Sequence, residues 1–196
     1  LPLLRCSVRW YESFRADPRA LPLANRHYNR QNPNSPQFVP PGRCLVLLTE
    51  NSDALWVTSA PLAAYVKHAW AGAWMCSCFR NESTELSSEL IREAVAATVA
   101  HFGKSPQPHG FVTFVDASKT RRKRDPGRCY VKAGWTRLEQ KTKGGLVVLQ
   151  LRPEEMPAGE SAIKRPATEP PPRPLIEVRP SAQTSFMFSA EVLCAP

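Results

Sequence analysis

The sequence contains no run of about 18 consecutive apolar residues, the length that a membrane-spanning helix requires. Its amino end also lacks a basic stretch followed by a long apolar core, which is the pattern of an export signal. We therefore expect a cytoplasmic protein with no membrane partner. A hydrophobic fraction of 42% over 196 residues is enough for one domain, or for one domain followed by a tail.

Metal-binding cysteine patterns are missing as well. Six cysteines are scattered along the chain, and no second Cys or His pair at zinc-finger spacing accompanies Cys76 and Cys78. These two residues are spaced to lie on one face of a strand. We expect the cysteines to be small, buried side chains in a reducing compartment, without disulfides.

Positive charge is abundant and unevenly placed. Residues 1–151 hold 21 Lys and Arg against 11 Asp and Glu, whereas residues 152–196 hold 5 against 6. Such an excess indicates a polyanionic partner such as DNA or RNA, and solubility alone is the simpler alternative. A dense basic cluster favours the first interpretation, and it comprises Lys119, Arg121, Arg122, Lys123 and Arg124.

The apolar pattern predicts an α/β (α+β) domain with a mixed sheet flanked by helices. Short apolar runs predict strands over residues 44–49, 54–58, 71–79, 111–115 and 146–151. Apolar residues at spacings of three and four predict one long helix over 86–102, followed by Gly103. We expect shorter helices over residues 18–27, 61–70 and 127–132.

The composition changes after Leu151. Nine of the twenty prolines fall between Arg152 and Pro196, with few periodic apolar residues. Such a segment buries too little surface to offset the entropy lost on ordering. We therefore expect one folded domain over 1–151 and a Pro-rich, extended or disordered tail over 152–196.

The expected strand over 111–115 leads into the most informative part of the chain. Asp116 lies at the exit of this strand, and the basic cluster follows it. Farther on, Tyr130, Lys132, Gly134 and Trp135 stand at fixed offsets. This Tyr-x-Lys-x-Gly-aromatic segment resembles the final signature of the GNAT acyltransferase superfamily, which implies a mostly antiparallel central sheet and an acyl-CoA substrate.

Other short motifs narrow the resemblance. His27-Tyr28, then 79–83 with Leu86-Ser87-Ser88, then Asp116 and Tyr130 occur in an order similar to that of the phage Mom-type DNA-modifying proteins, a divergent GNAT branch. The similarity covers roughly residues 5–151, and it makes the domain over 1–151 a GNAT-like catalytic domain. It implies an enzyme that uses acetyl-CoA, adds a carbamoylmethyl-type group to the exocyclic amine of adenine in double-stranded DNA, and so protects phage DNA from restriction. It also implies the cytoplasm of a bacterial host, and a homodimer is compatible with it.

The resemblance gives each matching residue an expected role. His27, Tyr28, Arg80, Asp116 and Tyr130 match functional positions, with Asp116 or His27 as the base and Tyr130 as the acid. Leu86, Ser87 and Ser88 match the helix start that holds the pyrophosphate of the cofactor, a place suited to anions. Typical GNAT members have a Gly-rich loop there, but this chain has none between Arg80 and Phe102. Arg80, Arg92 or hydroxyl groups would have to compensate.

Each of these residues also has a structural interpretation. Ser87 can cap a helix, Asp116 can cap a turn, and Tyr130 can be a core aromatic with a bonded hydroxyl. His27 and Asp116 together offer an imidazole and a carboxylate, a ligand type that suits the iron linked to this family. Two ligands do not complete a metal site, so iron is a hypothesis for metal analysis.

Two other functions fit the same residues. One keeps the fold and acetyl-CoA but changes the acceptor to a protein lysine, a tRNA or a small amine. The other is a non-catalytic nucleic-acid-binding module, which the missing glycine loop favours. Mass spectrometry of nucleosides separates the first from DNA modification, and calorimetry with acetyl-CoA separates the second.

Overall fold

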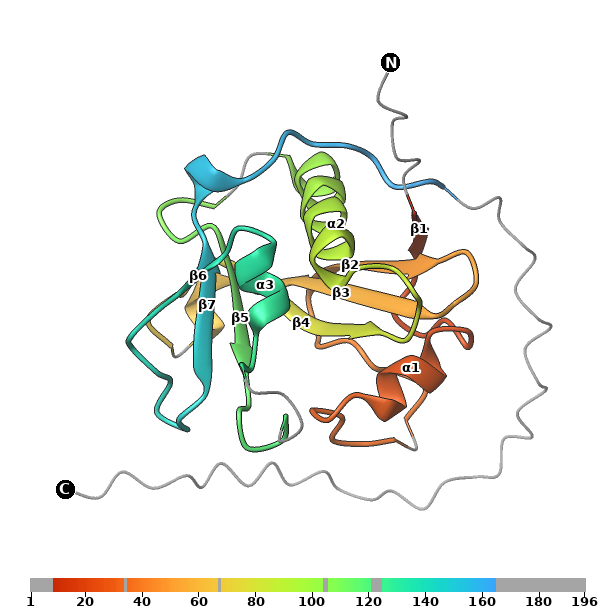
Figure 1. Ribbon diagram of the computed structural model, residues 1–196, viewed down its shortest axis with the longest axis horizontal. Helices are drawn as coiled ribbons and strands as arrows, with labels where there is room; N and C mark the ends of the chain where they lie inside the picture. Colours follow the sequence, from red (N-terminus) through yellow and green to blue (C-terminus); the bar gives the residue numbers. More distant parts are fainter. Residues whose placement is uncertain (1–8, 34, 67, 104–105, 121–124, 165–196) are drawn as a thin grey trace, which may run out of the picture. The chain divides into compact units, whose positions relative to one another are not determined.

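The computed structural model describes residues 9–33, 35–66, 68–103, 106–120 and 125–164. Among them seven strands form one sheet, in the order β1-β2-β3-β4-β5-β7-β6 (Figure 1). All neighbouring strands are antiparallel except β4 and β5, which are parallel. The strands are β1 (Trp10–Ser13), β2 (Arg43–Thr49), β3 (Ala54–Ala60), β4 (Trp74–Asn81), β5 (Phe111–Val115), β6 (Thr136–Arg137) and β7 (Val147–Leu151).

This arrangement confirms the predicted mixed, mostly antiparallel sheet flanked by helices. The helices are α1 (Leu21–Arg26), α2 (Ser87–Phe102) and α3 (Arg128–Lys132), with 3-10 turns at η1 (Ala63–Tyr65) and η2 (Pro153–Glu155). The helix expected over 61–70 is wrong, because the described residues of that range form only the turn η1. Strands β1 and β6 were not predicted, because four and two residues are too short to show a clear alternation.

The two faces of the sheet bury different clusters. On β2, Leu45 and Leu47 belong to the cluster that contains buried residues of α2, whereas Val46 and Leu48 pack with residues of α1. Because successive strand residues point to opposite faces, α2 and α1 must cover opposite sides of the sheet. The core therefore consists of two layers, one on each face of the sheet.

Helix α2 carries the longest apolar stripe of the chain. Leu90, Ile91, Ala94 and Val95 are buried against the sheet, as predicted. Leu86, however, precedes the helix and is 64% exposed, so it does not belong to the stripe. Strand β1 also holds this helix, because the indole N–H of Trp10 donates a hydrogen bond of 2.9 Å to the carbonyl of Leu90.

The first compact unit of the chain extends beyond the expected boundary at 151 and ends at 165. Ile163 forms a bridge with Tyr11, and its N–H donates to the carbonyl of Trp10 at 2.9 Å. Ala162 is 6% exposed. Residues 152–164 therefore belong to the domain rather than to a tail, and the rest of the expected tail lies outside the described residues. Among the residues described, no helix has both the length and the apolar character to cross a membrane.

Candidate functional site

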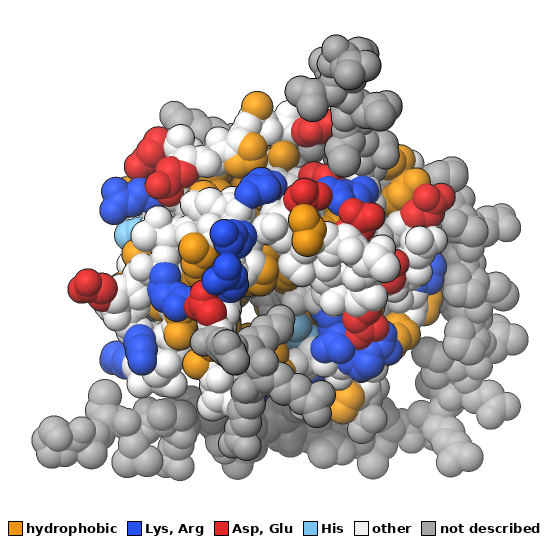
Figure 2. Space-filling model, in the orientation of Figure 1, with side chains coloured by type: hydrophobic (Ala, Val, Ile, Leu, Met, Phe, Trp, Pro, Cys, Tyr) orange, Lys and Arg blue, Asp and Glu red, His pale blue; other side chains and the backbone are white. Residues whose placement is uncertain are grey.

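The main cavity lies where the two parallel strands separate. Strands β4 and β5 pair only between Trp74–Cys76 and Phe111–Thr113, after which β4 continues to Asn81 and β5 ends at Val115. A cavity of about 1480 Å³ occupies the opening, with residues of α3, the start of α2, and residues 26–41 in its walls. On the face in Figure 2, Lys and Arg side chains gather over α1 and the end of β4, beside a histidine side chain.

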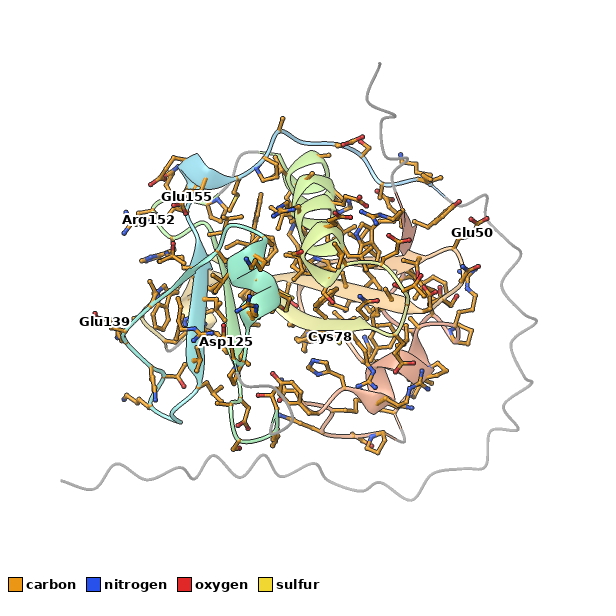
Figure 3. The ribbon with its side chains drawn as sticks, in the orientation of Figure 1. Glu50, Cys78, Asp125, Glu139, Arg152 and Glu155 are labelled. Carbon is orange, nitrogen blue, oxygen red and sulfur yellow. The ribbon has the colours of Figure 1, made fainter. Side chains whose placement is uncertain are left out.

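A β-bulge on β4 lies beside this opening. The register between β3 and β4 shifts after Val57, which faces Cys78, so that Thr58 faces Cys76 and Ser77 is the extra residue. Cys76 therefore joins the cluster of α2, and Cys78 joins the cluster of α1. Figure 3 labels Cys78 on β4. The expectation that both cysteines share one strand face is wrong, because an extra residue reverses the alternation. As a result, the cavity is lined by residues from both faces of the sheet.

Tyr130 forms the floor of the cavity on the α2 side. Its hydroxyl lies 3.4 Å from the Sγ of Cys76, and its ring makes edge contacts with Phe79 and Trp135. Burial raises the pKa of the phenol well above its ordinary value. The hydroxyl therefore keeps its proton across the physiological pH range. Gly127 is required just before α3, because it has a φ of +83° and a Cβ there would meet Leu149 Cδ1 at 2.9 Å.

His27 and Tyr28 enter the cavity from the other side, directly after α1. Their rings stack at a centroid distance of 4.5 Å. Burial, together with the positive charge of Arg80, lowers the pKa of His27 to about 4. The Nδ1 of His27 accepts a hydrogen bond of 3.3 Å from the N–H of Asn29. A neutral ring that accepts at Nδ1 carries its proton on Nε2, so His27 offers a hydrogen-bond donor rather than a base.

Asp116 follows β5, as expected, and its carboxylate caps the next turn. The Oδ1 atom accepts hydrogen bonds from the N–H and the hydroxyl of Ser118, at 2.9 and 2.6 Å. The Oδ2 atom lies 3.8 Å from the Nζ of Lys119. The bonds from Ser118 and the charge of Lys119 hold the pKa of Asp116 below its usual value, which makes its carboxylate a weak base. Its N–H lies 3.5 Å from the Tyr28 hydroxyl, which brings the two matched positions together.

Arg80 lines the cavity at the end of β4, where it is part of a charge network. Its Nε donates to Glu82 at 2.6 Å, and its Nη1 donates to the carbonyl of Arg26 at 2.6 Å. Arg26 pairs with the same carboxylate through two hydrogen bonds, of 2.9 and 2.6 Å. The hydrogen bonds from Arg26, and to a smaller extent the bond from Arg80, lower the pKa of Glu82 to about 2. Arg92, in contrast, bonds the carbonyl of Lys132 and does not line the cavity.

The start of α2 reaches the cavity through Ser87 but not through Leu86 or Ser88. The N-cap residue, Leu86, has no side chain that can cap this helix start, so among the described residues it leaves N–H groups of the first turn to other partners. Asn81 holds the segment in place instead, because its Nδ2 donates to the carbonyl of Glu85 at 2.8 Å and to the Oγ of Ser87 at 3.0 Å. Sequence reasoning did not identify Asn81 as a residue that positions the helix start. An Asn two residues before Ser83 is typical of an Asx-turn, in which the Asn side chain bonds the backbone two residues on.

The basic cluster is only partly described. Lys119 lines the cavity and pairs with Asp116, whereas Arg121, Arg122, Lys123 and Arg124 lie outside the described residues. The iron hypothesis is likewise untested. No three His, Cys, Asp or Glu side chains gather at one point in the described part of the chain. Iron at His27 and Asp116 therefore stays a prediction, to be checked by metal analysis of the purified protein.

Asp17 precedes α1, and its carbonyl accepts hydrogen bonds from the N–H groups of Ala20 and Leu21 at 3.0 and 3.1 Å. Its side chain is 1% exposed and accepts hydrogen bonds from the hydroxyl of Ser13 and from Arg19, both at 2.7 Å. Burial acts to raise the pKa of Asp17, but these bonds outweigh it and hold the pKa below 3.8. The ionised side chain therefore stabilises the fold fully above the unfolded pKa, and this contribution is lost as the pH falls through the folded pKa.

We expect Asp17→Asn to lower the free energy of unfolding by about 1–3 kcal/mol at neutral pH, the value of hydrogen bonds to a charged group. The difference from the unsubstituted protein should shrink as the pH falls below about 4. Urea unfolding as a function of pH measures it. A difference that does not change with pH would show that charge is not the cause.

Comparison with known proteins gives no match: no protein-family model, curated protein or solved structure matches this chain. The resemblance to the Mom-type proteins therefore depends on the matching residues alone.

Proposed function

We propose that this chain is an acyl-CoA-dependent transferase that modifies the exocyclic amine of adenine in DNA, in the manner of the phage Mom-type proteins. Such a modification would protect the DNA from restriction enzymes. The observation that carries the proposal is the cavity between β4 and β5, which has a protonated phenol on one side and the His27–Tyr28 pair on the other. A group-transfer enzyme needs such an opening, because its two substrates must meet at one point from different directions.

The side of the cavity near α2 fits the acyl carrier. A volume of about 1480 Å³ is large enough for an extended nucleotide cofactor together with an acceptor. The uncapped start of α2 offers N–H groups and the positive end of the helix dipole to a pyrophosphate. When bound, acetyl-CoA supplies an acyl carbon activated as a thioester.

The residues around the cavity have complementary roles in the transfer. The amine nitrogen would form a bond to the acyl carbon while the carbon–sulfur bond breaks, which gives an N-acetyl group. The carbamoylmethyl-type group is joined through a CH2 carbon and contains a further nitrogen, so these residues account for the acetyl transfer alone. Tyr130 donates its proton to the departing sulfur, because its raised pKa keeps it protonated. His27 donates a hydrogen bond from Nε2 to the oxygen that gains negative charge. Asp116 does not itself line the cavity, but it follows the lining residue Val115 and stays ionised, and we assign to this weak base the proton that the amine loses.

Mass spectrometry of nucleosides tests the proposal. DNA from cells that express the chain should contain a modified deoxyadenosine, and DNA treated with the purified protein should contain it only when acetyl-CoA is added. Tyr130→Phe tests the acid, because it keeps the ring contacts with Phe79 and Trp135 and removes only the hydroxyl. This variant should lose about 10²–10⁴-fold in rate, the usual contribution of an acid catalyst.

Two results would contradict the proposal. Unmodified DNA together with acylation of a lysine peptide, a tRNA or a small amine would move the chain to a different acceptor. DNA binding without heat release on titration with acetyl-CoA would indicate a nucleic-acid-binding module instead.

A further inference from the structure

The walls of the cavity carry positive charge and no negative charge in the part of the chain that the structure describes. Their charged side chains are Arg26, Arg30, Arg80 and Lys119. Two of these, Arg26 and Arg80, share the carboxylate of Glu82, which lies outside the lining. Lys119 lies near Asp116. Only Arg30 has no carboxylate within ion-pair distance among the described residues.

Arg30 is instead fixed by neutral oxygens. Its Nε donates to the Oδ1 of Asn25 at 2.9 Å, its Nη1 donates to the carbonyl of Gln37 at 2.9 Å, and its Nη2 donates to the carbonyl of Ser35. A guanidinium group has five N–H donors, so this arrangement leaves donors for a further partner. The charge of Arg30 also reaches β4 on the same side of the sheet: burial raises the pKa of Cys78, and the charges of Arg80 and then Arg30 act against this rise.

The segment that carries Arg30 forms the wall of the cavity on the α1 side. It supplies exposed amide side chains from Asn29, Gln31 and Gln37, and no acidic residue. The start of α2, where the acyl carrier fits, lies on the opposite face of the sheet. A polar wall with one fixed cation suits a nucleotide strand, because amides can bond base edges and a guanidinium matches the geometry of a phosphate.

We propose that the wall formed by residues 29–32, 35 and 37 receives the DNA strand that presents the acceptor amine, and that Arg30 contacts the phosphate beside the acceptor nucleotide. This inference rests on the proposed function and names the side from which its substrate enters. The neutral acceptors hold the guanidinium in place before DNA arrives, so little side-chain entropy is lost on binding.

The salt dependence of DNA binding tests this role. Each phosphate contact contributes about 0.9 to the slope of log K against log salt concentration on duplex DNA. Arg30→Gln should therefore reduce the slope by about 0.9 and weaken binding roughly tenfold at low salt. Arg30→Lys should keep the slope, because it keeps the charge, but should bind more weakly because it loses the planar fork.

Arg15→Gln is the matched control. Arg15 is also held by neutral acceptors, the carbonyl of Gly42 at 2.7 Å and the Sγ of Cys44 at 3.4 Å, and it does not line this cavity. The substitution Arg15→Gln removes the same charge at a place away from the cavity. The salt-dependence slope of this variant should therefore stay within error of that of the unsubstituted protein. Equal slopes for Arg30→Gln and Arg15→Gln would overturn the inference, as would equal loss of slope in Arg30→Gln and Arg30→Lys.

A duplex with one methylphosphonate beside the target adenine gives a second test. The neutral linkage should weaken binding by the unsubstituted protein about as much as Arg30→Gln does, with no further loss when both changes are combined. Additive losses would overturn the contact. These are binding measurements, so a protein that binds DNA through Arg30 but leaves it unmodified would contradict only the proposed function. Unchanged slopes in a protein that modifies DNA would contradict only this inference.

Discussion

Replacing His27 with alanine is expected to lower kcat for base modification by about 10²–10³-fold, the usual loss when one donor to a developing negative charge is removed. His27 is neutral because its pKa is about 4, and its Nδ1 is already used by the N–H of Asn29. Single-turnover kinetics with a DNA duplex and acetyl-CoA measure the chemical step. Binding of DNA should change little, because the substitution removes no positive charge at neutral pH.

The variant His27→Gln separates a donor from a base. Glutamine can donate a hydrogen bond but cannot accept a proton at neutral pH, so it should recover part of the activity that alanine loses. If His27 is the base instead, glutamine and alanine should be equally inactive. The pH profile gives an independent check. An acidic limb near pH 6.5 that disappears in His27→Gln would contradict the lowered pKa of this imidazole.

The largest expected loss of stability follows from Trp56→Ala, at about 3–5 kcal/mol. Trp56 is fully buried on β3, and its ring makes edge contacts with Phe79 and Phe111, one on each of the two strands that separate at the cavity. Its indole N–H donates to the hydroxyl of Thr58 at 2.7 Å. The substitution would therefore leave a void in the core and remove one of the two side-chain hydrogen bonds of the Thr58 hydroxyl, which keeps its bond to the hydroxyl of Thr98 at 2.9 Å.

Urea unfolding measures this loss as a fall in the transition midpoint at unchanged slope. Phe14→Ala is the control, because Phe14 is 57% exposed and its truncation should change the free energy of unfolding by no more than about 0.5 kcal/mol. Similar losses for the two variants would mean that the core around Trp56 relaxes to fill the space.

Much of the fold could be predicted from local patterns. The stripe on α2 and the apolar runs of β2, β3 and β5 are long enough to show their periodicity. The α3 segment was expected from the Tyr-x-Lys-x-Gly-aromatic pattern that begins at Tyr130. Strand β1 was missed, because its four residues are stabilised by Trp10 packing under α2 and by pairing with residue 163, and neither contact is local in sequence.

Sequence reasoning named several residues of the cavity but not their hydrogen bonds, and three of its residues, Leu86, Ser88 and Asp116, do not line the cavity. His27, Tyr28, Arg80 and Tyr130 do line one cavity, which brings together positions up to about a hundred residues apart. The hydrogen-bonding state of His27 and the turn that Asp116 caps depend on neighbours only two residues away, yet they require backbone geometry that the sequence does not display. The bulge at Ser77 was hidden for a related reason, since one extra residue leaves no mark in composition.

The described walls of the cavity contain no carboxylate, and this determines how the binding of an anionic ligand there responds to pH and to salt. Arginine and lysine stay charged throughout the physiological range, and the imidazole of His27 stays neutral above about pH 4. The electrostatic potential that an incoming anion meets is therefore nearly constant with acidity, and it varies instead with ionic strength. A cell could release the ligand by raising its salt concentration, whereas acidification to pH 5 would leave the attraction unchanged.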